Sequence, residues 1–145
     1  MNLTKTQFSS RGVLVLSLCL LASFANAQRD LDPGRFEQTI LAFEEQDKVS
    51  PPAQGAILLT GSSSIARWND QAAAALAPLS VIPRGFGGSV MGDLLHYLDR
   101  VALAYKPRAI LVYEGDNDTA FHIAEDKIVG QFEQIVAKVH AALPE

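Results

Sequence analysis

One stretch of this chain, from Gly55 to Trp68, constrains the fold more than any other. It begins with a short apolar run, residues 56–60, whose length and branching are typical of a strand buried on both faces. The run ends at Gly61, and three consecutive serines follow before residues that can start a helix. In open α/β folds, ligands bind at the edge of the sheet where strands end. The stretch therefore predicts small hydroxyl side chains at such an edge, beside the free backbone N–H groups of a helix start.

Strands and helices alternate along the rest of the chain. We expect three strands, at about residues 56–60, 79–83 and 108–113. Helices are expected before, between and after them, at about residues 33–48, 68–76, 89–104 and 123–143. The pair Asp32-Pro33 is typical of a helix start, and Ser89 is expected to cap the third helix. Short strands that alternate with helices predict one small α/β domain with a parallel sheet and right-handed crossovers.

The first 27 residues have the pattern of a signal peptide. Lys5 and Arg11 precede an apolar run at residues 13–24, and Ala25-Asn26-Ala27 is a small-residue cleavage site. The apolar run is shorter than the roughly 20 residues that a membrane-spanning helix needs, so no stable membrane anchor is expected. We predict that residues 28–145 form the mature chain and that it is exported, either to the periplasm or out of the cell.

Charge and cysteine content argue against several functional classes. The formal net charge is −4, and cleavage of the leader would remove basic residues but no acidic ones. The mature chain is therefore still more acidic, and nucleic acid is not expected as a partner. The single cysteine, Cys19, lies in the leader. The chain has three histidines and no Cys/His cluster, which predicts no structural zinc site. We also expect no organic cofactor, because neither a dinucleotide nor a phosphate-loop motif is present.

Each predicted strand ends in a polar or glycine-rich loop. These loops are Ser62–Ser64, Gly85–Ser89 and Gly115–Asp118, and in a parallel sheet all three lie at the same edge. Acyl transfer needs a hydroxyl nucleophile and N–H donors aimed at the oxyanion. A serine hydroxyl, a glycine N–H and an asparagine amide are suitable parts for that chemistry.

Simpler interpretations of the same loops stay open. The serines can serve only as a turn and helix cap, and the glycines only as a tight turn. The Asp116–Asp118 segment can be an Asx turn or a weak cation site. A metal is not expected there, because the carboxylates are adjacent and lack the spacing of a calcium loop. The α/β-hydrolase elbow is excluded, since Ile65 stands where that motif has its second glycine.

Taken together, the three loops resemble the sequence blocks of the SGNH or GDSL hydrolases (GDSL-like lipases, esterases and acylhydrolases). The resemblance covers about residues 53–143. Gly61-Ser62-Ser63 stands where the family has Gly-Asp-Ser, Gly88 matches the second-block glycine, and Gly115–Asp118 matches Gly-x-Asn-Asp in full. The resemblance implies a three-layer, flavodoxin-like α/β fold with a parallel sheet.

The resemblance also implies roles for individual residues. Ser63 corresponds to the nucleophile, and Gly88 and Asn117 correspond to oxyanion donors. Further candidates for substrate contact at the same edge are Ser62, Arg84 and Asp118. For Arg84, a surface or loop-bracing role is the alternative.

One block of the family is missing. Family members carry an Asp-x-x-His after two more strands, and this chain shows neither the strands nor that block. The segment Asp93-Leu94-Leu95-His96 has the spacing, but it lies within a predicted apolar helix, and we expect it to be helix surface rather than catalytic. About three of five strands are therefore present, and the general base is absent.

We accordingly expect an exported serine esterase or acylhydrolase domain, residues 28–145, that is inactive or nearly so by itself. Its substrate would be a small-molecule, saccharide or lipid ester with an O-acyl or O-acetyl group. The exposed edge of the third strand favours self-association. The alternative function is a non-catalytic exported module that binds a saccharide or acyl ligand without turnover. A nucleotide-binding domain is a more remote alternative, because the phosphate loop is lacking.

Overall fold

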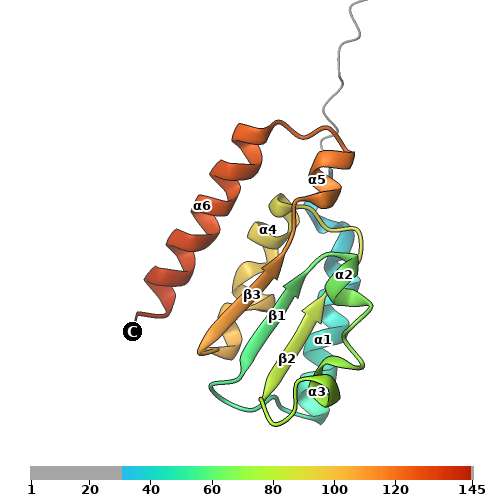
Figure 1. Cartoon of the computed structure of the whole chain (residues 1–145), viewed down its shortest axis with the longest axis vertical. Helices are drawn as coiled ribbons and strands as arrows, with labels where there is room; N and C mark the ends of the chain where they lie inside the picture. The colour runs from blue at the N-terminus through green and yellow to red at the C-terminus, as the bar shows by residue number, and fades with distance from the viewer. Residues whose placement is uncertain (1–30, 145) are drawn as a thin grey trace, which may run out of the picture.

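The computed structural model describes residues 31–144, so the predicted leader lies outside the described residues. Within them, a parallel three-stranded sheet in the order β2-β1-β3 has helices on both faces (Figure 1). The strands are β1 (Ile57–Gly61), β2 (Val81–Gly85) and β3 (Ala109–Tyr113). The predicted α/β fold and the parallel sheet are confirmed.

The three strands end at the same level. Gly61 at the end of β1 is paired in register with Gly85 of β2 and Tyr113 of β3. Because β1 is the central strand and is covered on both faces, Leu58 and Leu59 are both buried although they point in opposite directions. The continuous apolar run in the sequence is explained by this position.

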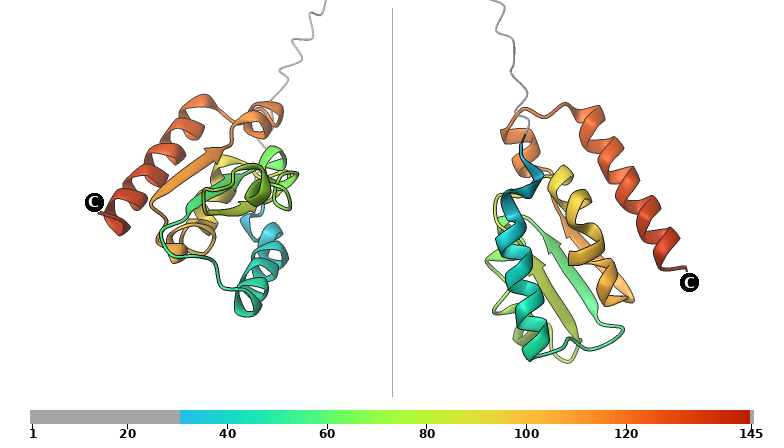
Figure 2. Two further views of the ribbon diagram at one scale, coloured as in Figure 1. Left: turned by 60° about the horizontal axis from the view of Figure 1, so that its bottom comes forward. Right: turned by 180° about the vertical axis from the view of Figure 1, so that it is seen from behind.

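The larger core lies on one face of the sheet. It is covered by α1 (Glu37–Val49), α4 (Met91–Val101) and α6 (Glu125–Ala142), seen from behind in Figure 2. Two 3₁₀ turns, η1 (Pro33–Phe36) and η2 (Leu103–Tyr105), flank α1 and α4. Phe86 lies at the centre of this core, with its ring edge-on to Phe36 at 5.1 Å and to Tyr97 at 6.4 Å. The predicted start of the first helix is confirmed, because the Asp32 side chain accepts a hydrogen bond from Gly34 N at 2.8 Å.

The opposite face is covered by two short helices, α2 (Ser63–Ala66) and α3 (Ala72–Ala75). The predicted helix at 68–76 is therefore wrong over its first four residues. The reason is Asn69, whose side chain donates to Gly85 O at 2.9 Å and accepts from Gly85 N at 3.0 Å. These bonds hold the segment before α3 in a turn against the end of β2.

A further short helix, α5 (Asp116–Ala120), follows β3 directly. The sequence predicts a loop or Asx turn there, and this prediction is corrected. Gly115 makes the helix possible, because its φ of 111° turns the chain two residues after the strand ends. None of the helices between residues 31 and 144 has the length and apolar character that crossing a bilayer requires.

One side of the sheet is open. On β3, Leu111 and Tyr113 are 46% and 47% exposed, and on α6 the side chain of Phe132 is 45% exposed. Between β3, α4 and α6 lies an apolar groove of about 270 Å³, lined by Leu98, Ile110, Val112, Phe132, Ile135, Val136, Val139 and His140. The exposure that the sequence predicts for the third strand is present, and one face of the last helix is exposed as well.

Candidate active site

The site is built where the strands end and α2 and α5 begin, at one edge of the sheet (Figure 1). Two backbone hydrogen bonds join the three strand ends just beyond the ladder. Ser62 N donates to Tyr113 O at 3.0 Å, and Phe86 N donates to Gly61 O at 2.9 Å. The loops after all three strands therefore start from a fixed common base.

Ser63 is the first residue of α2 and is half-buried. Its neighbour across the site is Gly87, where an added Cβ would lie 3.6 Å from the Cβ of Ser63. The glycine loop after β2 is thus in van der Waals contact with the predicted nucleophile. The next turn of α2 packs on the end of β2 even more closely, since a Cβ at Gly85 would lie 2.2 Å from Ala66 N.

Gly88 has a φ of 90°, a conformation that favours glycine, although a Cβ would meet nothing within 4 Å. Its carbonyl oxygen accepts a hydrogen bond from Arg35 Nη2 at 3.1 Å. Within residues 31–144, the N–H of Gly88 has no hydrogen-bond acceptor. The donor that the resemblance assigns to this residue is therefore free to bind a ligand.

Asn117 connects the third loop to the second. Its Nδ2 donates to the backbone carbonyl of Ser89 at 2.8 Å. Since the amide has two hydrogens, this bond leaves one of them available. The structure thus brings Ser63, Gly88 and Asn117 to one edge of the sheet through contacts between their loops.

Two of the three candidates for substrate contact, Ser62 and Asp118, are fully buried, so that interpretation is corrected. The hydroxyl of Ser62 donates to Asp116 Oδ1 at 3.3 Å. Both carboxylate oxygens of Asp118 accept from Met91 N at 3.1 Å, at the start of α4. They brace the loops instead of presenting groups to a ligand. The predicted Ser89 cap of α4 is also wrong, because Val90 is the N-cap residue and Asp118 takes the first N–H.

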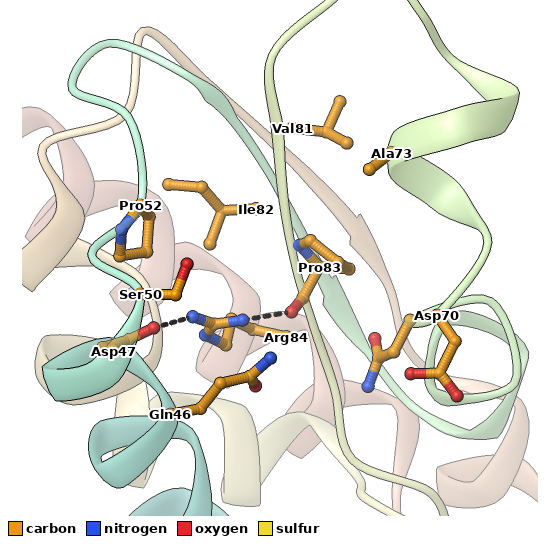
Figure 3. Close-up of a pocket in the computed structure, with 11 residues that line it drawn as sticks. Gln46, Asp47, Ser50, Pro52, Asp70, Ala73, Val81, Ile82, Pro83 and Arg84 are labelled. Atoms are coloured by element: carbon orange, nitrogen blue, oxygen red, sulfur yellow. Dashed lines mark hydrogen bonds and ion pairs between the residues drawn. The ribbon is translucent and has the colours of Figure 1, made fainter.

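Arg84 is the third candidate, and it too is buried. Its guanidinium forms an ion pair with Asp47 of α1 and donates to Pro83 O at 2.7 Å (Figure 3). It also donates to the Tyr105 hydroxyl at 3.0 Å. A pocket of about 430 Å³ adjoins it, lined by residues of α1, β2 and the segment before α3. The loop-bracing alternative accounts for these contacts, and the substrate role does not.

Glu114, between β3 and Gly115, is an ionisable residue of the site that is not among the residues predicted from the sequence. The Ser89 hydroxyl donates to Glu114 Oε1, whereas the buried Oε2 has no partner among the described residues. The pKa of Glu114 is raised to about 8, chiefly by burial and also by the carboxylates of Asp118, Asp116 and Asp93, while the hydrogen bond from Ser89 opposes the rise. Burial also raises the pKa of Asp118. A charged residue directly after an apolar strand is the signal that identifies Glu114 in retrospect.

The segment with Asp-x-x-His spacing does not form a catalytic pair. The Asp93 side chain is 2% exposed and forms a 2.5 Å ion pair with Arg35, so its expected surface position is corrected. His96 is exposed, as expected, and its ring packs edge-on against Tyr97 at 4.6 Å. His122 and His140 are exposed as well. Across residues 31–144, no three His, Cys, Asp or Glu residues gather closely enough to hold a metal ion.

Comparison with known proteins agrees with this geometry. A family model described as "GDSL-like Lipase/Acylhydrolase family" matches residues 50–145. No curated protein matches the chain.

Several solved structures share the fold. A GDSL-like lipase from Bacteroides thetaiotaomicron has a TM-score of 0.63 and 15% identity, over 77% of this chain and 55% of that one. A candidate acylhydrolase from Bacteroides fragilis has a TM-score of 0.62 and 18% identity, over 78% and 55%. A protein from Streptococcus pneumonia, described as a candidate platelet activating factor, has a TM-score of 0.63 and 22% identity, over 74% and 50%. The chain spans about half the length of these structures.

Proposed function

Because the chain belongs to the GDSL-like lipase/acylhydrolase family, we propose that it carries the nucleophile and the oxyanion donors of a serine ester hydrolase. The observation that carries this proposal is the convergence of the three strand-end loops. Gly87 lies against Ser63, and Asn117 is hydrogen-bonded to the residue after Gly88. The reaction is hydrolysis of an O-acyl ester.

In this reaction the Ser63 hydroxyl oxygen attacks the acyl carbon and forms the new C–O bond. The carbonyl π bond breaks, and negative charge develops on the former carbonyl oxygen. Collapse of this tetrahedral intermediate breaks the ester C–O bond and releases the alcohol, and water then hydrolyses the acyl-serine. The N–H groups of Ser63 and Gly88 and the free amide hydrogen of Asn117 are the donors for that charge. Such donors stabilise the transition state more than the substrate, which is how they accelerate the step.

The proton of Ser63 needs an acceptor. All three histidines are exposed, and the nearby carboxylates of Glu114 and Asp118 are already hydrogen-bonded and have raised pKa values. Loss of a triad member typically costs several orders of magnitude in rate. We therefore propose that this chain by itself hydrolyses esters slowly or not at all.

We further propose a substrate class and a location for the protein. An exported chain would meet extracellular or periplasmic esters, and O-acetyl groups on saccharides and lipid esters are the classes that we favour. Export rests on the leader pattern at residues 1–27. The measurement is the intact mass of the chain recovered from the periplasm or medium. A mass that starts at Gln28 supports export, and an intact leader on all of the protein contradicts it.

The first test of the chemistry is p-nitrophenyl acetate hydrolysis by residues 28–145, beside Ser63→Ala and Ser64→Ala. Ser64 is the matched control, because it is the neighbouring half-buried serine of the same helix. We expect a rate close to the blank for all three chains. Fast turnover that Ser63→Ala abolishes would mean that a histidine of this chain, with His96 first in line, supplies the base.

A second readout tests the nucleophile even when turnover is slow. A fluorophosphonate phosphonylates serine with loss of fluoride, and peptide mass spectrometry locates the adduct. We expect labelling at Ser63 that increases with pH, is lost in Ser63→Ala and is kept in Ser64→Ala. The alternative, a non-catalytic binding module, predicts saccharide or acyl-ligand binding with no labelling above that of the heat-unfolded chain.

A further inference from the structure

We propose that Arg35 is a positioning residue for this oxyanion site, acting through the backbone of Gly88 and Ser89. The inference rests on the proposed function and adds a residue from outside the three loops. Arg35 lies in η1, before α1, more than 50 residues away along the chain, yet its Nη2 donates to Gly88 O at 3.1 Å. No feature of the sequence pattern points to this contact.

Arg35 completes a network that fixes two consecutive peptide planes. In the Gly88–Ser89 peptide, the carbonyl is held by Arg35 and the N–H donates to Phe86 O at 3.3 Å. In the next peptide, the Ser89 carbonyl is held by Asn117 at 2.8 Å, and Val90 N donates to Asp93 Oδ2 at 2.9 Å. Every polar backbone group of the two planes is therefore held.

Asp93 connects the two halves of this network. The same Oδ2 atom that accepts from Val90 N also accepts from Arg35 Nη2 at 2.5 Å. The Asp93 side chain is 2% exposed, whereas that of Arg35 is 29% exposed. Arg35 thus neutralises a buried carboxylate and reaches Gly88 O with the same nitrogen. Arg35 Nε also donates to Asp93 Oδ1 at 3.5 Å, so the guanidinium holds both carboxylate oxygens and Gly88 O together. A lysine ammonium keeps the charge but has one nitrogen and no planar fork, so it cannot reproduce all three contacts.

The position of Arg35 is itself fixed by packing. Its guanidinium lies 4.6 Å from the centre of the Phe36 ring, and Phe36 packs edge-on against Phe86 at 5.1 Å. Phe86 lies in the glycine loop, directly after β2, and is buried. The η1 segment is therefore attached to the loop at two points, one apolar and one polar.

This network fixes the two oxyanion donors, Gly88 N–H and the Asn117 amide, that lie beside these peptide planes. The free N–H of Gly88 lies directly before them, and Asn117 depends on the Ser89 carbonyl for its orientation. Without Arg35, the flexible Gly87–Gly88 segment loses its fixed orientation, although the core beneath it is unchanged. A residue with a merely structural role would alter the thermal midpoint without altering these two donors.

The test is an NMR titration of the ¹⁵N-labelled chain with phenylphosphonate, a stable tetrahedral anion that mimics the oxyanion. The variants are Arg35→Lys, which keeps the charge, and Arg108→Gln, an exposed charge-loss control at the start of β3. We expect wild-type shifts at the amides of Ser63 and Gly88 and at the Asn117 side chain. For Arg35→Lys we expect a Kd about fivefold higher, together with exchange broadening at residues 87–89, because a charge-assisted hydrogen bond is lost. Arg108→Gln should bind as the wild type does.

Other outcomes separate the two proposals. Wild-type binding and sharp loop signals in Arg35→Lys would overturn the role of Arg35, provided that Asn117→Ala weakens binding. Unchanged phosphonate binding in Arg35→Lys and Asn117→Ala alike would overturn the oxyanion site itself. The same conclusion would follow if the wild type showed no shift at Ser63, Gly88 and Asn117. If circular dichroism shows that Arg35→Lys does not fold, Asp93→Asn replaces it. It is expected to weaken binding in the same way, because Arg35 then loses its orienting carboxylate.

Discussion

The backbone of Gly61 lies directly against the carbonyl of Tyr113, so closely that a Cβ on Gly61 would be 2.0 Å from that oxygen. Gly61 also has a φ of 129°, where side chains are strained. The glycine before the predicted nucleophile is therefore required by the contact between two parallel strands, whatever the chemistry that follows.

Gly61→Ala is expected to destabilise the fold by about 3 kcal/mol or more, because strand β3 must move and the backbone is strained. The control is Gly130→Ala on α6, where a Cβ would meet nothing within 4 Å and alanine is the better helix former. Urea unfolding of both variants checks this. A Gly61→Ala chain as stable as the wild type would show that the strand ends are not so tightly joined.

Arg84 and Asp47 form an ion pair whose side chains are 6% and 19% exposed. Arg84→Met is expected to cost about 3 kcal/mol, because it leaves the carboxylate of Asp47 without its cation. The double variant with Asp47→Leu should recover part of that loss, which a double-mutant cycle in urea measures. Phosphonate binding by the folded variants should be unchanged. Loss of binding in a folded Arg84 variant would restore the substrate role that the structure argues against.

Glu114 makes stability depend on pH. Its pKa is about 8 in the fold against an ordinary value of 4.5, so between these values the folded chain keeps a proton that the unfolded chain releases. This group therefore favours the fold fully below about pH 4.5, and its contribution is lost as the pH rises through about 8. Glu114→Gln should remove a fall in the free energy of unfolding of about 2 to 4 kcal/mol between pH 5 and 8.

The measurement for Glu114 is urea unfolding at several pH values across that window. Glu133→Gln, an exposed position on α6, is the control and should leave the wild-type profile intact. Some pH dependence remains in Glu114→Gln, because burial also raises the pKa of Asp118. Identical profiles for the wild type and Glu114→Gln would count against the buried carboxyl.

The open edge of β3 predicts self-association. Leu111 and Tyr113 are exposed on this strand, which carries no lysine or proline between residues 109 and 113. Leu111→Lys is expected to lower the sedimentation-average mass relative to the wild type. Val49→Lys, which replaces an 88% exposed valine at the end of α1, should have no effect. A wild-type chain that sediments as a monomer at high concentration would refute the prediction.

The elements that the sequence predicts best are those whose pattern comes from burial. β1 reads as one apolar run because it is the central strand, and α6 shows its period because one side of it packs against α4 and the larger core. By contrast, the turn before α3 depends on the two bonds between Asn69 and Gly85, which are 16 residues apart. Alanine-rich composition alone favours a longer helix there.

The candidate site also has parts that the sequence predicts and parts that it does not. The three loops and their order are visible in the sequence, because strands with parallel neighbours must end at one edge. The supporting contacts are not visible, since they join residues that are far apart along the chain. Arg35 with Gly88, and Arg84 with Asp47, are examples. Burial of Ser62 and Asp118 likewise follows from packing that no local pattern encodes.

The common level at which Gly61, Gly85 and Tyr113 end their strands has one more consequence. Each loop starts from the same rigid platform, and the loops are joined again by contacts such as that of Asn117 with Ser89, so only segments beyond these contacts can change length freely. An insertion after α5 would enlarge the rim of the site without displacing Ser63, and one after Ser89 would instead disturb both donors. For protein engineering, the segment after α5 is thus the place to graft new specificity, and the glycine loop is the part to leave untouched.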